Sequence, residues 1–369
     1  MSTKLTSPLT IKIPAGSLKP YLNRALLFIK DAKLGLSPLL GCLYLKADKC
    51  FVYNGETGAE LSMPFSVTQP TLLFPFELAK VVNAARELTD VLLTFDYKAM
   101  VLIAETTTIR TRIRLLATET QDLAILDGIK VPPDMVPFAV EGLYERIKRS
   151  SFTCSEDASL PLLQGVRITK ESICTTDQRA VWREQGVSSE AFVIPKLLRE
   201  HIERLGQEPS RIGLMPNQLY VFYNDLVCFG GRLEAEKNEK GLDRYPDVDG
   251  ALVRVRAQDN AAVVSYDREA LAERVTALLS LPQYENAVTM KCVAGLLSVQ
   301  NAVGAGVETE SVISMAVQST ADFDSVHLNG QLLLEGVSRF SQFAVKADQR
   351  RLLFWNGTSE YAVSRRNVQ

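Results

Sequence analysis

The sequence predicts an α+β protein built from three tandem copies of one domain, because short patterns return at a spacing of about 120 residues. Pro38-Leu39-Leu40 recurs as Pro161-Leu162-Leu163, and Pro75, before a helical pattern, recurs as Pro195. A looser third copy begins at Leu328-Asn329. This period exceeds the roughly 20 to 50 residues of solenoid repeats, so each copy is large enough for its own core. Three such domains favour a ring or an arc over a single-site enzyme.

Each domain combines strand-like and helix-like segments. In the first, residues 9–13 alternate as a strand, and Ser17 is the expected N-cap of a helix over 18–31. Ala47-Asp48 is the expected turn between two strands. The remaining helices are expected over 76–90, 139–151, 196–205, 267–279 and 331–343.

The predicted domains are 1–131, 132–253 and 254–369. Pro132-Pro133 marks the first boundary, since adjacent prolines stop both helix and sheet. The second boundary falls in the region 250–256 and has a weaker signal.

The composition describes a globular chain with large cores. Hydrophobic residues make up 46% of the sequence, and the formal net charge is −2, which excludes a strongly basic chain. The six cysteines are far apart and contain no C-x-x-C pair. Neither an N-terminal leader pattern nor an 18-residue apolar run occurs, so we expect a soluble, cytoplasmic protein.

Catalytic patterns are scarce. His201 and His327 are the only histidines, which leaves almost no room for Ser-His-Asp, Cys-His or multi-histidine metal sites. Gly304-Ala305-Gly306 lacks the third glycine of a dinucleotide site, and no phosphate-binding loop is present. The sequence therefore predicts no catalytic residue, no metal, no cofactor and no enzymatic activity.

Basic residues on the predicted helices slightly outnumber acidic ones, at 15 Lys and Arg against 12 Asp and Glu. This excess is too small for tight nucleic-acid binding, and no stacking run of aromatic residues accompanies it. Sequence-specific readout of DNA is therefore not expected.

The middle domain carries the residues of a resemblance. Leu160–Ile168 reads LPLLQGVRI and is followed by Thr176-Asp177, while Ile194-Pro195 and Tyr245-Pro246-Asp247 come further along. At these positions the chain resembles the bacterial β sliding clamps, the processivity subunits of replicative DNA polymerases. The resemblance implies three α+β clamp domains with helices on one face of antiparallel sheets, two subunits forming a six-domain homodimeric ring, and non-enzymatic tethering of a polymerase to duplex DNA.

The resemblance also implies site residues. The helix residues expected to face DNA, with no readout of sequence, are Lys19, Arg24, Lys30, Lys80, Arg146, Arg149, Lys196 and Arg199. The pocket expected to bind peptide motifs of the polymerase and clamp loader is lined by Leu163, Thr176, Val181, Pro246 and Val363. The expected dimer contacts are Leu278, Leu279 and Ile113.

The chain departs from the family in two motifs near this pocket. Gln178-Arg179-Ala180 replaces the family's Gly-His-Arg, and Ser364-Arg365-Arg366-Asn367 replaces its terminal Met-Pro-Met-Arg. The loop over 234–244 is also longer than usual. This divergence motivates the hypothesis of a bacteriophage-encoded clamp with its own polymerase. The alternative is a clamp-like scaffold that binds replication proteins without being loaded on DNA. A hydrolase or nuclease would need clustered ligands that the sequence lacks.

Overall fold

The computed structural model describes residues 8–29, 40–116, 135–186, 188–233, 245–281, 286–301, 310–348 and 350–364. Several predicted features lie outside these residues: Pro38, Lys30, the Pro132-Pro133 linker, the 234–244 loop, Gly304-Ala305-Gly306 and the residues after Ser364. The described chain forms two compact units, which comprise Met1–Tyr144 with Ile194–Leu233, and Glu145–Val193 with Glu234–Gln369.

Unit 1 is built on one antiparallel sheet of eleven strands in the order β1-β6-β7-β8-β5-β2-β3-β4-β15-β14-β13. Its strands are β1 (Leu9–Pro14), β2 (Leu43–Lys46), β3 (Lys49–Tyr53), β4 (Thr57–Ser62), β5 (Thr71–Leu73), β6 (Asp90–Asp96), β7 (Val101–Glu105), β8 (Arg110–Leu116), β13 (Arg211–Leu214), β14 (Gln218–Phe222) and β15 (Leu226–Gly231). Pairing of β4 with β15 continues the sheet of the first predicted domain into strands of the second, so neither strand leaves a free edge at this seam.

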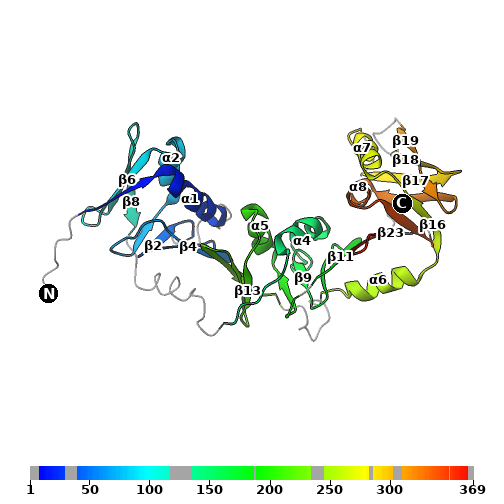
Figure 1. Ribbon diagram of the computed structural model, residues 1–369, viewed down its shortest axis with the longest axis horizontal. Helices are drawn as coiled ribbons and strands as arrows, with labels where there is room; N and C mark the ends of the chain where they lie inside the picture. Colours follow the sequence, from blue (N-terminus) through cyan, green and yellow to red (C-terminus); the bar gives the residue numbers. More distant parts are fainter. Residues whose placement is uncertain are drawn as a thin grey trace. The chain divides into compact units, whose positions relative to one another are not determined.

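Three helices of unit 1 are α1 (Ala15–Ile29), α2 (Pro75–Ala84) and α5 (Lys196–Leu205) (Figure 1). Helix α1 contacts both α2 and α5. Its buried face includes Leu18, Leu22, Ala25 and Ile29, as the helical periodicity predicts. Helix α5 has the predicted bounds, and Gly206 ends it with a positive φ of 65°.

The start of α1 differs from the prediction. Ser17 lies inside the helix, not at its N-cap, because α1 already begins at Ala15. The amide groups of Ala15 and Gly16 donate to the backbone oxygens of Thr89 and Glu87, at 2.9 and 2.8 Å. These tertiary acceptors satisfy the first helical donors, a task that the sequence pattern assigned to a side chain.

Helix α2 is shorter than the predicted 76–90. It ends at Ala84, and the backbone of Ala85 is extended. Leu88, which the periodicity placed on the buried helix face, lies in the following turn and is 94% exposed. The prediction was wrong here because local periodicity did not reveal the turn that leads into β6.

Unit 2 contains two sheets. The larger has the order β12-β9-β10-β11-β24-β23-β22-β16-β20, and the smaller has the order β19-β18-β17-β21. Their strands are β9 (Val166–Ile168), β10 (Ser172–Thr176), β11 (Ala180–Gln185), β12 (Phe192–Ile194), β16 (Asn260–Ser265), β17 (Ala287–Val293), β18 (Leu296–Asn301), β19 (Val312–Ala316), β20 (Gln318–Ser319), β21 (Phe323–Asn329), β22 (Gln342–Lys346), β23 (Arg351–Trp355) and β24 (Ser359–Ser364). A second seam joins β11 to β24 in antiparallel register.

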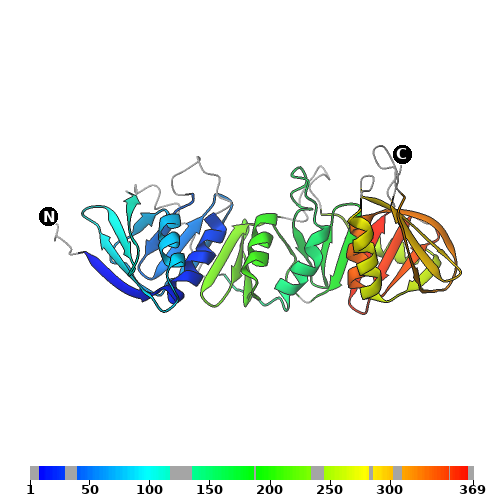
Figure 2. The ribbon, with the colours of Figure 1, turned by 90° about the horizontal axis from the view of Figure 1, so that it is seen from above.

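The helices of unit 2 are α6 (Val248–Ala257), α7 (Arg268–Leu279) and α8 (Gly330–Arg339), together with the short 3-10 helix η1 (Ser151–Thr153). Helices α7 and α8 run beside each other (Figure 2). The side chains of Asp267 and Asn329 cap them by accepting hydrogen bonds from backbone amides of the first turn. Helix α4 (Leu143–Ser150) spans the point where the chain passes from unit 1 to unit 2, and it is shorter than the predicted 139–151.

Trp182 of β11 anchors the seam between β11 and β24. It is 2% exposed and belongs to the main core of unit 2. Its ring lies 6.2 Å from that of Tyr361 on β24 and 5.6 Å from that of Phe340. Aromatic packing therefore stabilises the pairing of two strands that are far apart in the sequence.

Helix α6 was not predicted. The sequence indicated only a domain boundary in this region, and the predicted boundary between residues 253 and 254 falls inside the helix. The Asp247 side chain accepts a hydrogen bond from the amide of Gly250 at 2.9 Å and caps α6. No helix in the described residues has the length and apolar character needed to cross a membrane.

Candidate functional site

The cations of α1 and α2 make local contacts. The Lys19 ammonium donates to the backbone oxygen of Ala85 at 2.7 Å, just beyond the C-terminus of α2. Lys80 is exposed and pairs with Glu77 at 2.7 Å, one turn earlier on the same helix. Lys19 thus stabilises a helix end, whereas Lys80 extends from the surface.

Arg24 of α1 is tied to the turn between β14 and β15. Its Nη1 lies 2.6 Å from each carboxylate oxygen of Asp225. The two side chains are 21% and 33% exposed, so solvent reaches the pair. The ion pair joins a helix of the first predicted domain to a turn of the second.

Arg146 and Arg149 of α4 share one acceptor. Arg149 donates from Nη2 and Nε to the two oxygens of Glu184, at 2.6 and 3.1 Å. Arg146 lies 3.6 Å from the same carboxylate and also donates to the backbone oxygen of Gln185. The Glu184 side chain is only 7% exposed, and its hydrogen bond raises the pKa of Arg149.

The two basic candidates of α5 differ in exposure. Lys196 begins the helix and is half-buried. Arg199 is only 8% exposed, and its guanidinium lies 3.7 Å from Glu200. A phosphate would therefore reach Lys196 more easily than Arg199.

A cavity of about 440 Å³ lies on unit 2 between α6, the turn before β11, and strands β23 and β24. Val181 and Val363, two of the residues expected in the peptide pocket, line it, and Leu252 and Val255 of α6 add further apolar surface. Residues of α6 were absent from the predicted pocket because the helix itself was not predicted. The Pro-Asp pair before it, with Asp247 as N-cap, was the available signal.

The other predicted pocket residues do not line this cavity. Leu163 and Thr176 are buried, and the Thr176 hydroxyl donates to the backbone oxygen of Ala180 at 2.8 Å. Pro246 lies just before α6 and is half-buried. Thr176 thus shapes the turn that leads to Val181.

Arginines surround the apolar floor of the cavity. Arg179 and Arg254 are exposed, and Arg351 lies 3.7 Å from Asp348. Within the described residues, the lining contains no acidic side chain. The cavity therefore combines an apolar floor with a basic rim.

Ion pairs hold α6, the wall of this cavity, against the sheet. Arg183 of β11 lies 2.5 Å from Asp249 and 3.8 Å from Glu360 of β24. Arg256 near the end of α6 lies 2.7 Å from Glu360. Because β11 and β24 both contribute to this network, it holds α6 against the sheet where these two strands pair.

The turn at Gln178 has a strained backbone. Gln178 has a φ of 74°, in the left-handed region that glycine adopts most easily. The Asp177 carboxylate accepts from the amides of Arg179 and Ala180 at 2.8 and 2.7 Å and holds the turn. The strain occurs at the position where the resemblance to the β sliding clamps implies glycine.

Replacing Gln178 with glycine should stabilise the protein. We expect a gain of roughly 0.5–1 kcal/mol, because removal of the left-handed strain outweighs the greater freedom of glycine in the unfolded chain. Urea unfolding monitored by tryptophan fluorescence measures it. The matched control is Lys170→Gly in the turn before β10, which should lower stability; a Gln178→Gly variant that also loses stability would contradict the argument.

The predicted dimer contacts are buried within the single chain. Leu278 and Ile113 are 1% and 3% exposed, and Leu279 packs partly buried against the core of unit 2. The exposed residues on β8 are Arg110, Arg112 and Arg114, which alternate with inward-facing residues. This arginine row was not among the predicted site residues, although the alternation RTRIRLL is a readable strand signal.

Several strand edges lack a partner in the described residues, and those of β8 and β19 are two of them. On β8, the segment Arg110–Arg114 pairs with β7 on one side, while β5 pairs only with Leu115 and Leu116. Strand β19 pairs only with β18 and ends the smaller sheet of unit 2. Exposed strand edges of this kind can pair with another chain.

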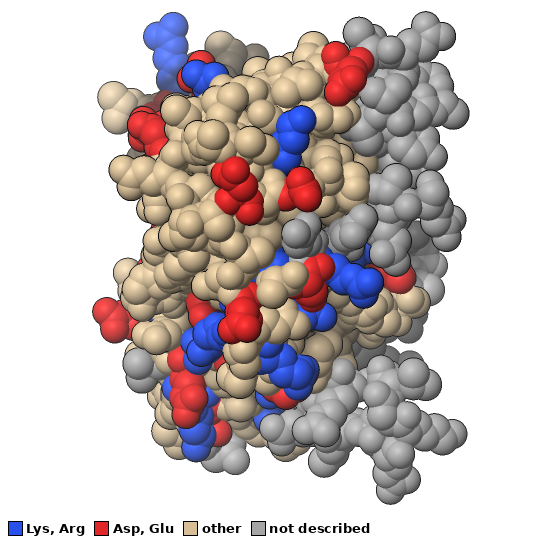
Figure 3. Space-filling model, turned by 90° about the vertical axis from the view of Figure 1, so that its right-hand side faces the viewer, with Lys and Arg blue, Asp and Glu red and all other residues tan. Residues whose placement is uncertain are grey.

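The smaller sheet of unit 2 also exposes apolar side chains. Val293, Leu296 and Val312 are 54%, 49% and 51% exposed. Figure 3 shows this end of unit 2, with few charged residues in its upper part and mixed Lys, Arg, Asp and Glu below. An exposed apolar surface beside a free strand edge is typical of an interface.

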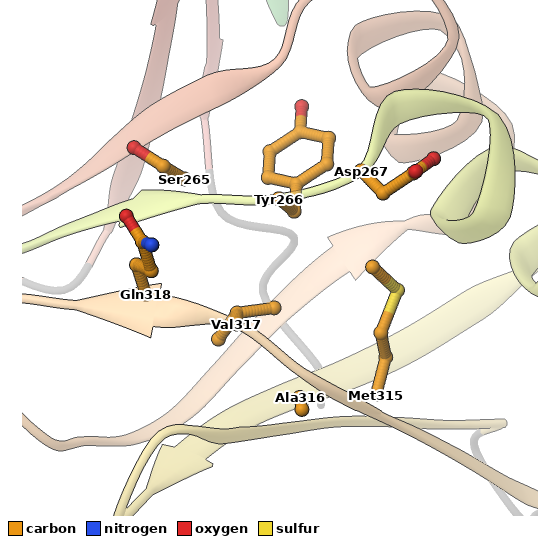
Figure 4. A pocket seen from close by; sticks show the side chains of 7 residues that line it. All are labelled: Ser265, Tyr266, Asp267, Met315, Ala316, Val317 and Gln318. Carbon is orange, nitrogen blue, oxygen red and sulfur yellow. The ribbon is translucent and has the colours of Figure 1, made fainter.

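A second cavity, of about 480 Å³, lies where the chain passes from β19 to β20 (Figure 4). Met315 extends toward Asp267, and the Tyr266 phenol points away from Ala316 and Val317. The Tyr266 hydroxyl is buried without a hydrogen-bond partner in the described residues, and burial raises its pKa. The cavity is thus lined by the end of β16 and by the segment that joins β19 to β20.

The described residues offer little for catalysis. They contain no cluster of three or more His, Cys, Asp or Glu side chains that could hold a metal ion. All six cysteines are free and buried, and burial raises the pKa of the Cys50 thiol to about 12. His201 is fully buried against Phe28, with its Nε2 at 2.9 Å from the Thr57 hydroxyl.

Comparison with solved structures identifies the fold. The C. crescentus beta sliding clamp superposes with a TM-score of 0.79 at 14% identity, covering 98% of this chain and 100% of that one. The sliding clamp of Bacillus subtilis gives a TM-score of 0.78 at 12% identity, again covering 98% and 100%. The DNA polymerase III subunit beta of Pseudomonas aeruginosa, bound to griselimycin, gives 0.76 at 15% identity with the same coverage.

These similarities establish the sliding-clamp fold over nearly the whole chain, and they confirm the predicted α+β class. No protein-family model matches the sequence, and no curated protein matches it. The resemblance found in the middle-domain motifs is therefore confirmed at the level of the fold.

Proposed function

We propose that this chain is a DNA sliding clamp, a non-enzymatic cytoplasmic protein that encircles duplex DNA and tethers a polymerase to it. The observation that carries the proposal is the similarity to solved clamps over 98% of this chain and 100% of theirs. A clamp retained by topology needs no tight affinity for DNA, which agrees with a formal net charge of −2.

The proposed DNA contacts come from cations on helices. Lys80 and Arg149 are exposed, and Lys196 is half-buried. Long cationic side chains of this kind contact phosphates without reading bases. Lys19, Arg24, Arg146 and Arg199 would contribute more weakly, since they are half-buried or buried and also contact acceptors of the chain. Loose phosphate contacts of this kind permit sliding.

The cavity beside α6 is the proposed site for peptide motifs of a polymerase and a clamp loader. Its apolar floor suits a leucine or phenylalanine side chain, and its rim of Arg179, Arg254 and Arg351 favours carboxylates next to that anchor. The proposed occupant is therefore a peptide with apolar anchors and adjacent acidic residues.

Ring closure is proposed between β8 of one copy and β19 of another. Each strand has an unpaired edge, and the two edges lie in different units of the chain, so a head-to-tail contact repeated twice closes a dimer. Leu278, Leu279 and Ile113 would support this contact from the underlying cores.

Loading on DNA tests the function. We expect a solution mass near twice the 40.8 kDa of one chain, measured by size exclusion with light scattering. After loading by its cognate loader, the protein should stay on nicked circular DNA and leave when a restriction enzyme linearises the circle. Assembly and peptide binding without any retention on circles would replace this proposal with the unloaded scaffold.

A further inference from the structure

Most of the proposed DNA-facing cations already bind acceptors of their own chain. In the described residues this holds for every candidate except Lys196. Two of the acceptors stand out because each holds an arginine through both carboxylate oxygens. They are Asp225, on Arg24, and Glu184, on Arg149.

We propose that Asp225 and Glu184 lower the affinity of this chain for DNA by competing with phosphate for Arg24, Arg146 and Arg149. The inference rests on the proposed clamp function and concerns the regulation of the same surface. It makes the two carboxylates positioning residues, since each acts on DNA through the arginine that it binds.

The Glu184 site shows how the competition works. The Arg149 side chain is 45% exposed, so a phosphate can approach it, whereas Glu184 is 7% exposed and stays behind it. A second arginine, Arg146, lies 3.6 Å from the same carboxylate. One buried negative charge thereby offsets two cations of α4, and a phosphate meets a smaller net positive charge.

The Asp225 site works in the same way from a loop. Asp225 is 33% exposed and approaches Arg24 at 2.6 Å from the turn between β14 and β15. The pair is accessible to water, so a phosphate can approach it. To replace the carboxylate, however, the phosphate must break two short charge-assisted hydrogen bonds. Arg24 therefore contributes little to the salt-sensitive part of DNA binding while the pair persists.

Neutralising both acceptors should reveal the competition. The variant Asp225→Asn with Glu184→Gln keeps the side-chain shape and still accepts hydrogen bonds, but it leaves the arginines uncompensated. Binding to a labelled linear 30-base-pair duplex is measured by fluorescence anisotropy over a salt series from about 50 to 200 mM, the range in which phosphate contacts respond strongly. We expect a slope of log affinity against log salt that is steeper by about 1–2, and affinity higher by roughly 3–10-fold at the lowest salt.

The matched control is Glu60→Gln with Asp90→Asn. It changes the net charge by the same amount, but Glu60 pairs with Lys49 on β3 and Asp90 pairs with Lys12 on β1, neither of which is a candidate arginine. A purely structural role of the two carboxylates would change the unfolding midpoint without steepening the slope. If Glu184→Gln fails to fold, the same measurement is made on Asp225→Asn alone, because Asp225 is accessible and lies in a turn.

The outcomes separate the two proposals. A steeper slope in the test variant and an unchanged slope in the control support the competition. A wild-type chain that is retained on circular DNA, with test variants whose slope is unchanged or shallower, overturns it and leaves the clamp function standing. A wild-type chain that is neither retained on circles nor bound to the duplex overturns the clamp function, and the competition with it.

Discussion

Reversing the charges of Arg112 and Arg114 together should convert the proposed dimer to a monomer of 40.8 kDa. Both side chains are exposed on β8, where the outer edge of the strand has no partner in the described residues. Close charge pairs across an interface contribute about 1.5–7 kcal/mol in measured cases, so the loss of two should raise the dimer dissociation constant at least about 150-fold. Light scattering at micromolar concentration measures the mass.

Lys98→Glu is the matched control for this experiment. It reverses an exposed charge in the β6–β7 turn of the same sheet and should leave assembly unchanged. The double variant should also lose retention on circular DNA, because an open arc cannot be held by topology. A double variant that remains dimeric would place ring closure elsewhere, and β19 would then need another partner.

The sequence predicted the elements whose periodicity is local. Helix α5 has the predicted bounds because apolar spacing, a preceding proline and a following glycine all agree. Apolar spacing also predicted α7 over 267–279, but α8, predicted over 331–343, ends at Arg339 and is followed by β22. Local propensity, pattern and capping point to the same answer at these positions.

Elements that depend on distant partners were not predicted. The early start of α1 requires the backbone oxygens of Glu87 and Thr89, which lie far along the chain. Helix α6 has only a weak amphipathic pattern and is held by Arg183 and Glu360 from the seam strands. Such contacts leave no periodic trace in the sequence of the helix itself.

At the candidate site too, the sequence revealed residues that belong to local motifs but not those that depend on distant segments. Family motifs indicated Val181 and Val363, and both line the cavity, whereas Leu252 and Val255 depend on a helix that was not predicted. The basic helix residues were readable from the sequence, but their acceptors Asp225 and Glu184 come from other segments. Sequence alone therefore overstated how many cations are free to meet phosphate.

The arginine rim predicts which peptides bind beside α6. Arg179 and Arg254 are exposed on opposite elements of the cavity, one before β11 and one on α6, while Val181 and Val255 form its apolar surface. An apolar anchor supplies affinity by burying its side chain, and the rim selects its neighbours by charge. The charges act near the surface, so their effect should weaken as salt is raised.

A fluorescein-labelled peptide with a Leu-Phe pair between two aspartates should bind the wild-type chain about 10-fold more tightly than its asparagine counterpart, from roughly 0.5–1 kcal/mol for each exposed ion pair. The double variant Arg179→Glu with Arg254→Glu should reverse this preference, because carboxylates would then meet like charges. Arg268→Glu, an exposed reversal on α7 outside the cavity, is the control and should bind like wild type. Equal binding of the two peptides to the wild-type chain would show that the rim does not select acidic partners, whereas a reversal confined to the rim variant identifies Arg179 and Arg254 as the residues that read the peptide.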